Sequence, residues 1–200
     1  MNKIVASVCV VALFASVASA TNYFVVPPGT PGVPENPDYL SWETAGTNIH
    51  EAVYLSNTVP SKDSTKKTQP HVLYVKTGTY IVTNHLTLAD CQFEIRSSKG
   101  PDAQEELDRD GTILCGGYPA TTNRIFNVDA GSTARSCQIR GLTITNGWVG
   151  TLTKSGRSAN WGGGVRFTGA GHAQTGVYDC NIVGNTAFCG SGGGVATACF

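Results

Sequence analysis

From residue 71 onward, apolar and polar residues alternate over short stretches separated by turn-forming residues, a pattern typical of β-strands. Most of these stretches span three to five residues, and no amphipathic helical pattern lies between them. A regular succession of strands without intervening helices excludes folds that alternate the two. We therefore predict an all-β fold. The predicted strands are 72–75, 80–82, 86–88, 93–96, 112–114, 124–128, 138–139, 142–145, 165–167 and 177–182.

Two short patterns recur along the chain. Glycine triplets at 162–164 and 192–194 are each followed by valine, and Cys-x-Ile-x-Gly occurs at 137–141 and again at 180–184, an offset of 43 positions. Repeats of this length mark units that bury their apolar faces by stacking on one another. The turn pairs at 110–111 and 146–147 would also suit a sandwich of hairpins, but the repeat favours a solenoid. Stacking would bury two pairs: Ile139 with Ile182, and Val165 with Val195.

Residues 1–20 have the features of a signal peptide. Lys3 precedes an apolar run, and Ala18, Ser19 and Ala20 supply the small residues that signal peptidase requires. We expect cleavage after Ala20 and export, so that the mature protein is secreted or lies on the outer cell surface. A membrane anchor is the alternative, but the run is short for the ~30 Å of a bilayer core. No later stretch would cross a membrane after cleavage.

Residues 21–70 form a distinct N-terminal part. A short apolar strand at 23–26 leads into a segment with five prolines, which block the hydrogen bonding of a sheet and predict a surface loop. A helix is predicted from about Asn48 to Ser56, with Asn48 as its cap and Glu51 completing a capping box. Ile49, Ala52 and Val53 fall on one face, so this helix would cover the end of a core. Residues 56–70 are polar and predict a solvated loop.

Several segments together resemble bacterial right-handed parallel β-helix proteins of the pectate-lyase-like superfold. They are the stretches 75–80 and 141–147, the Cys-x-Ile unit with its glycine triplet, and residues 41–44 and 49–53, which resemble that family's N-terminal capping helix. The glycine-rich unit is similar to repeats of polymorphic outer-membrane proteins. The resemblance implies a right-handed parallel β-helix over 71–200 with a short helical cap before it.

The position of the second triplet, close to residue 200, leads to a further expectation. No polar capping segment follows it, and a solenoid that ended there would expose apolar side chains and unpaired strand edges. We expect the coils to be incomplete at this end and to continue beyond residue 200. A partner domain that covers this end is the alternative.

The charge of the chain is balanced, with 14 basic and 14 acidic residues. Removal of Lys3 with the leader would leave a net charge near −1. No polybasic stretch is present, so nothing in the sequence indicates nucleic acid as a partner.

Six cysteines follow the leader, and export would place them where disulfides persist. Cys137 and Cys180 occupy matching positions of the repeat and would lie about 4.8 Å apart in stacked strands. Their side chains would then point the same way, which suits a ladder of buried thiols better than a disulfide. The pairing of any disulfides stays open among Cys91, Cys115, Cys137, Cys180, Cys189 and Cys199.

Catalytic motifs of known β-helix enzymes are absent from the sequence. The carboxylate pairs and the Gly-His-Gly and Arg-Ile-Lys motifs of polygalacturonases do not occur, and His172 lacks the second glycine. We therefore favour a non-catalytic protein that contacts polysaccharide or a host or cell-surface glycan. The alternatives are the N-terminal part of a polysaccharide lyase or glycoside hydrolase whose active coils lie beyond residue 200, and a purely structural stalk.

One acidic segment is a candidate metal site. Asp108 and Asp110 precede Gly111, and aspartates at this spacing before a glycine converge on Ca²⁺ in some binding loops. No glutamate follows at the required distance, so a solvated insertion between coils is the first interpretation and a Ca²⁺ site the second. No other cofactor is predicted.

The stretch from Trp148 to Trp161 is a candidate ligand-binding loop. Two indoles bracket a polar segment that carries Lys154, Arg157 and Asn160. Aromatic rings beside hydrogen-bonding side chains suit sugar binding, because the apolar faces of sugar rings pack on aromatic rings. The alternative is that both indoles fasten the loop to the flank of the solenoid.

Overall fold

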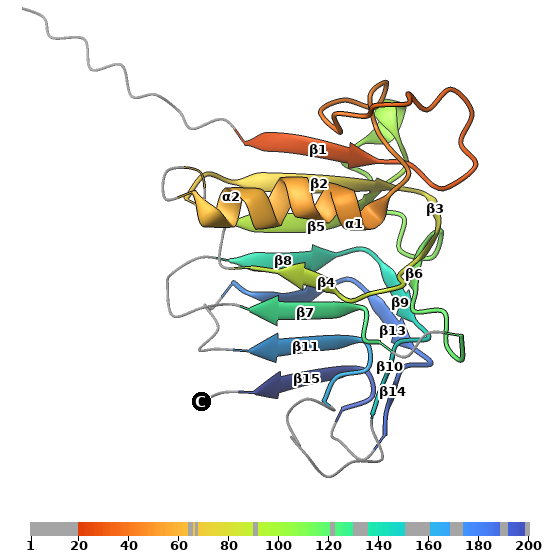
Figure 1. Cartoon of the computed structure of the whole chain (residues 1–200), viewed down its shortest axis with the longest axis vertical. Helices are drawn as coiled ribbons and strands as arrows, with labels where there is room; N and C mark the ends of the chain where they lie inside the picture. The colour runs from red at the N-terminus through yellow and green to blue at the C-terminus, as the bar shows by residue number, and fades with distance from the viewer. Residues whose placement is uncertain are drawn as a thin grey trace, which may run out of the picture.

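The chain folds into stacked parallel strands with one helical segment beside them (Figure 1). The computed structural model describes residues 20–63, 66, 68–89, 92–120, 123–129, 136–150, 161–168, 174–188 and 192–198. The strands are β1 Thr21–Val25, β2 His71–Lys76, β3 Gly78–Ile81, β4 Leu86–Leu88, β5 Phe93–Ser98, β6 Thr112–Cys115, β7 Phe126–Asp129, β8 Cys137–Arg140, β9 Thr143–Thr145, β10 Trp148–Val149, β11 Val165–Thr168, β12 Gly176–Tyr178, β13 Asn181–Val183, β14 Thr186–Ala187 and β15 Val195–Ala198.

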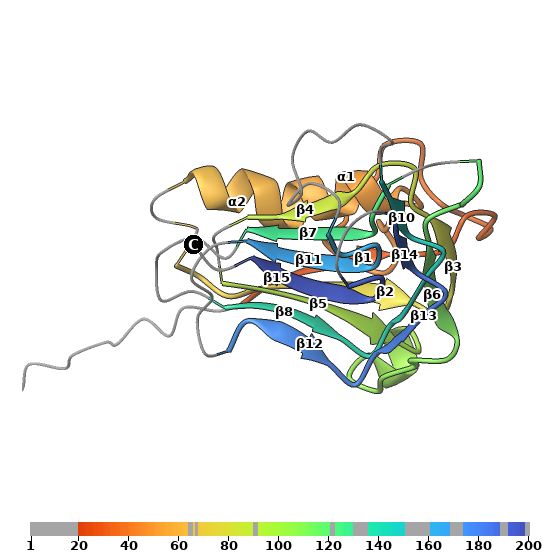
Figure 2. The same cartoon turned by 90° about the horizontal axis from the view of Figure 1, so that it is seen from below.

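The strands form three larger parallel sheets, and the chain visits these sheets in a fixed order. The first sheet has the order β1-β2-β5-β8-β12, the second β13-β9-β6-β3 and the third β15-β11-β7-β4. From β2 onward, each pass of the chain adds one strand to the first, then the second, then the third sheet, and β10 pairs with β14 between the second and third. Figure 2 shows the first and third sheets facing each other, with the second at one end.

The register of the sheets places apolar side chains of successive passes in inward-facing rows. Every member of these rows is at most 2% exposed. Burial of each such side chain is worth about 1.5–3 kcal/mol, so the rows account for much of the core. The rows are Leu73, Ile95 and Ile139 in the first sheet, Tyr80, Leu114 and Ile144 in the second, and Leu86, Phe126 and Val165 in the third.

The glycine triplets stack directly on each other, which confirms the 30-residue repeat. The backbone N–H of Val165 donates to the carbonyl of Gly194 at 2.8 Å, and Val165 pairs with Val195. A Cβ on Gly164 would lie 2.6 Å from the Gly194 carbonyl oxygen, so only glycine permits this approach. Val195 nevertheless remains 40% exposed, because β15 is the edge strand of its sheet and is covered on one side only.

The predicted stacking of Ile139 on Ile182 is wrong. Ile139 pairs with Val177, and Ile182 pairs with Ile144. Paired residues of these successive strands therefore lie 38 positions apart in the sequence and not 43. The two Cys-x-Ile-x-Gly runs lie in different sheets, although each is a strand that ends at a glycine with positive φ, 63° and 64°. Both runs therefore contain a strand that ends at a left-handed glycine, and this shared local structure accounts for their similar sequences although the two runs do not stack.

The thiol ladder is wrong for the same reason. Cys137 lies in β8 and its thiol donates to the carbonyl of Ala89 at 3.2 Å, whereas Cys180 lies in the turn before β13 and donates to the carbonyl of Tyr178 at 3.2 Å. Cys115 and Cys180 are free thiols, and burial raises the pKa of Cys180. The remaining cysteines, Cys91, Cys189 and Cys199, lie outside the described residues.

The N-terminal helix forms as predicted but extends further. Helix α1 covers Ile49–Val53, a π-helical turn η1 follows over Tyr54–Thr58, and α2 covers Val59–Lys62. The Asn48 side chain caps the start, accepting from the backbone N–H groups of His50 and Glu51. The predicted solvated loop is wrong over α2, where Pro60 occupies a first-turn position at which a missing N–H costs little.

The helix packs its apolar face on the end of the sheets. Ile49, Ala52 and Val53 are buried and contribute to the same core as the inward-facing rows. Glu51 does not close a capping box in the described contacts, and its carboxylate instead accepts from the Tyr39 hydroxyl at 3.1 Å.

Most predicted strands are confirmed within one or two residues. The stretch 177–182 is divided into β12 and β13 because Asp179 turns the backbone with a φ of 51°. A short 3-10 helix, η2, covers Pro101–Ala103. The predicted signal peptide lies outside the described residues up to residue 19. None of the helices in the described residues has the length and hydropathy needed to cross a membrane.

Candidate functional site

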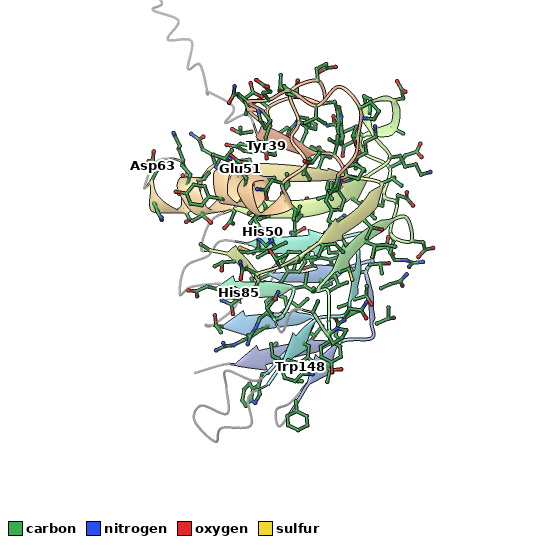
Figure 3. The ribbon with its side chains drawn as sticks, turned by 45° about the vertical axis from the view of Figure 1, so that its right-hand side comes forward. Tyr39, His50, Glu51, Asp63, His85 and Trp148 are labelled. Atoms are coloured by element: carbon green, nitrogen blue, oxygen red, sulfur yellow. The ribbon has the colours of Figure 1, made fainter. Side chains whose placement is uncertain are left out.

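Three aromatic side chains from successive passes form a row at the bend between the second and third sheets. The rings of Tyr118 and Trp148 are 5.7 Å apart with planes 11° from parallel, and those of Trp148 and Phe188 are 6.4 Å apart at 19°. Parallel rings at such separations are offset from one another, so each keeps part of its surface open. Tyr118 is 49% exposed and Phe188 44%. Figure 3 shows Trp148 at the surface of the molecule.

Backbone contacts hold the row in place. Trp148 pairs with Thr186 across β10 and β14, and its N–H donates to the carbonyl of Asn123 at 3.0 Å. The N–H of Phe188 donates to the carbonyl of Val149 at 2.7 Å, so the ring follows directly from a paired strand. Gly150 gives Phe188 room, because a Cβ there would lie 2.6 Å from the Phe188 Cβ. The row is thus built on fixed backbone.

The structure brings one predicted ligand-binding residue into this row. Trp148 is its central ring, whereas Trp161 is half-buried before the first glycine triplet and makes no ring contact within the described residues. Lys154, Arg157 and Asn160 lie outside the described residues. Sequence reasoning missed Tyr118 and Phe188. The sequence feature that could have identified them is the presence of an aromatic residue one pass before Trp148 and another one pass after it.

The predicted Ca²⁺ residues lie in a turn where protein groups already donate to their carboxylates. Asp108 accepts from the Thr77 hydroxyl at 2.6 Å and from the Gly111 N–H at 3.2 Å. Asp110 accepts from the Asn181 side-chain amide at 2.6 Å and pairs with Arg109 at 3.2 Å. Among the residues that the structure describes, no group of three metal-ligating side chains is found. In the described contacts, Asp108 binds the turn to the preceding pass through Thr77, and Asp110 binds it through Asn181 to a pass two further along the stack.

A second group of side chains is basic and was not predicted. His50 comes from α1, His85 precedes β4, Arg124 precedes β7 and Arg166 lies in β11, and these three strands are neighbours in the third sheet. Arg124 is 7% exposed. The Nε atom of Arg166 is buried and has no hydrogen-bond partner in the described part of the chain. Figure 3 shows His50 and His85 on the same side of the molecule.

The pKa values of Arg124, His85 and His50 are lowered by burial and by neighbouring basic side chains. Burial and the charge of Arg166 lower the pKa of Arg124 to about 10. Partial burial, then Arg124 and Arg166, lower the pKa of His85, and burial and His85 lower that of His50. No carboxylate contributes to these shifts. Chemically, such a group favours an anion and disfavours a further cation.

Comparison of the chain with protein-family models, curated proteins and solved structures finds no match. A function must therefore be inferred from the side chains that the fold brings together.

Proposed function

We propose that the chain is an exported, non-catalytic parallel β-helix of right-handed course, and that its row of aromatic rings contacts polysaccharide or a cell-surface glycan. The repeated course through three parallel sheets supports the β-helix, because successive passes stack strand on strand in constant order. The apolar leader of the sequence supports export to the outer surface or the medium.

The observation that carries the glycan proposal is the row of Tyr118, Trp148 and Phe188. Three near-parallel rings on consecutive passes form an extended aromatic strip, and two of them are almost half exposed. Exposed aromatic residues on a rigid scaffold are costly in water and suit the apolar faces of sugar rings. A strip that crosses several passes suits a chain of sugars better than a single small molecule.

Retention of the protein in gels that contain soluble galactan, xylan, β-glucan or peptidoglycan fragments tests this function. We expect at least one of these polymers to retard the parent protein. Trp148→Ala should weaken that binding about tenfold or more, because a central aromatic anchor contributes about 2 kcal/mol or more. Trp148→Phe should retain most of it.

Tyr54→Ala is the control, since Tyr54 is about as exposed, at 51%, as Tyr118 of the row, at 49%, but lies in the helical segment. It should bind like the parent. Circular dichroism of each variant separates lost binding from lost folding. The proposal fails if none of the polymers retards the parent, or if a folded Trp148→Ala variant binds undiminished.

A further inference from the structure

A cleft of about 290 Å³ lies on a different part of the molecule, between the proline-rich segment and the end of β2. Thr30 and Pro31 form one wall, Trp42 and Glu43 a second, and Lys76 with Pro101 a third. Four separate stretches of the chain therefore converge on one space. None of these residues belongs to the aromatic row or to the basic group.

The walls of the cleft are held by backbone hydrogen bonds. The N–H of Val26 donates to the carbonyl of Gly46 at 3.0 Å, and that of Thr30 donates to Pro27 at 3.2 Å. Ser41 and Thr44 exchange side-chain and backbone hydrogen bonds at 3.2 Å, which closes the turn that carries Trp42. The cleft is thus preformed, and a ligand would not have to order it.

Trp42 presents an anchored aromatic surface. Its ring lies 4.8 Å from that of Phe24 at a tilt of 54°, and its Nε1–H donates to the Gln104 side chain at 3.3 Å. The indole is half-buried, so one part packs on the protein while another part lines the cleft. Its polar atom is already satisfied, and the surface it offers to a ligand is apolar.

Two opposite charges line the same space without pairing. Within the described residues, neither Glu43 nor Lys76 forms a salt bridge. The Lys76 stem lies against Gly100, where a Cβ would be 3.2 Å from its Cε. The backbone N–H of Glu43 and the Ser41 hydroxyl lower the pKa of Glu43, so it is an ionised acceptor at neutral pH. The cleft therefore offers an acceptor and a donor beside an aromatic surface.

We propose that this cleft binds a single pyranose unit, with the apolar face of the sugar on Trp42, its hydroxyls donating to Glu43 and one of its oxygens accepting from Lys76. An apolar ligand would displace water from both charged groups without replacing its hydrogen bonds, and a simple anion would be repelled by Glu43. A neutral polyhydroxylated ring satisfies donor, acceptor and aromatic surface together. The site is independent of the glycan contact proposed for the aromatic row.

The fluorescence of Trp42 provides a direct test. The chain has three tryptophans, so a Trp148→Phe, Trp161→Phe variant leaves Trp42 as the sole indole emitter. This variant should be titrated with the methyl glycosides of glucose, galactose, mannose and N-acetylglucosamine up to roughly 50 mM, a range that detects millimolar dissociation constants. We expect a saturable change of emission with at least one glycoside. Glycine and inorganic sulfate serve as non-sugar probes and should cause none.

Variants of the charged residues complete the test. Glu43→Gln and Lys76→Met should each weaken glycoside binding about tenfold, because each removes one charge-assisted hydrogen bond. Lys99→Met, an exposed lysine outside the cleft, should bind like the parent. Tyr118→Ala and Phe188→Ala should also leave the response unchanged, which separates this site from the aromatic row. The proposal is overturned if no glycoside gives a saturable response, if glycine or sulfate gives the same response, or if neither charge variant weakens it.

Discussion

On the outward face of the first sheet, charged side chains lie beside side chains of opposite charge, whereas on the third sheet they lie beside side chains of the same charge. On the first sheet, Tyr74, Arg96, Arg140 and Tyr178 stand opposite one another on successive strands. Glu94 lies 3.6 Å from Arg96 and 3.5 Å from Arg140. The guanidinium groups also lie over the two tyrosine rings, at 5.7 and 5.5 Å. On the third sheet, His85, Arg124 and Arg166 gather instead, and neighbouring positive charge contributes to lowering the pKa of His85 and of Arg124.

The difference shows what regular stacking does to charge. Parallel passes place Arg96 and Arg140 at paired positions on adjacent strands, so these like charges meet unless a residue of opposite charge lies beside them. Glu94 has this role on the first sheet, where Glu105 adds a contact of 2.9 Å to Arg96. The basic group on the third sheet has no equivalent among the contacts described. The first face therefore serves stability, and the second brings positive charges close together.

Removal of the shared carboxylate should have the largest effect. Glu94→Gln leaves Arg96 and Arg140 facing each other, and we expect a loss of about 1–3 kcal/mol, the cost of a partly buried charged group that loses its partner. The thermal midpoint should fall by roughly 2–10 °C. Circular dichroism melting measures this shift. Glu106→Gln is the control, since it removes an exposed pair with Lys99, and should leave the midpoint unchanged. Equal midpoints for Glu94→Gln and the parent would show that Glu94 does not neutralise this face.

The same substitution on the two faces should have opposite signs. Arg96→Met leaves Glu94 and Glu105 without their main partner and should lower the free energy of unfolding by about 1–3 kcal/mol. Arg166→Met removes a repelling charge whose Nε is buried without a partner in the described residues, and should raise that free energy by up to about 1 kcal/mol. Urea unfolding of both variants measures the difference. If both variants were destabilised equally, the positive charges on the third sheet would not repel one another.

The smallest expected effect is a dependence on pH. The pKa of His85 is lowered from its ordinary value of 6.5, so below pH 6.5 the unfolded chain binds a proton that the folded chain does not. Stability should therefore fall as pH decreases from 6.5 toward the folded-state pKa, and should not change above pH 6.5. His50 adds to this loss. His85→Gln should reduce the slope, with a change of about 1–2 °C in the midpoint. An unchanged slope would contradict the effect of Arg124 and Arg166 on His85.

The strands and the helix cap could be predicted from sequence because they depend on local patterns. Alternating apolar residues mark β2 to β9, and Asn48 is recognisable as a cap from its neighbours alone. The register could not be predicted, since it depends on the lengths of the connections. Seventeen positions separate Trp148 from Val165, whereas nine separate Thr186 from Val195. Because the second connection is shorter, paired residues lie 38 positions apart in β10 and β14 but only 30 positions apart in β11 and β15.

The candidate sites were predictable only in part for the same reason. Trp148 is conspicuous in the sequence, but its partners Tyr118 and Phe188 become visible only once the passes are aligned. Arg124 and Arg166 lie 42 positions apart and have no shared motif, so their mutual effect follows from sheet order alone. Trp42 lies in a segment whose prolines indicate a loop, and the sequence does not show which strand end this loop meets.

The glycine triplets also bear on how such a chain can change its length over evolution. At this corner the backbones of the two passes bond directly, with Gly164 bonded to Gly193 and Gly194, and both triplets begin with a left-handed glycine, at 65° and 70°. A duplicated segment that ran from one triplet to the next would meet the same backbone surface on either side. No side chain would have to be altered at the junction. Unequal recombination within the gene could therefore add or remove whole passes here, while the aromatic and charged residues diverge separately in each copy.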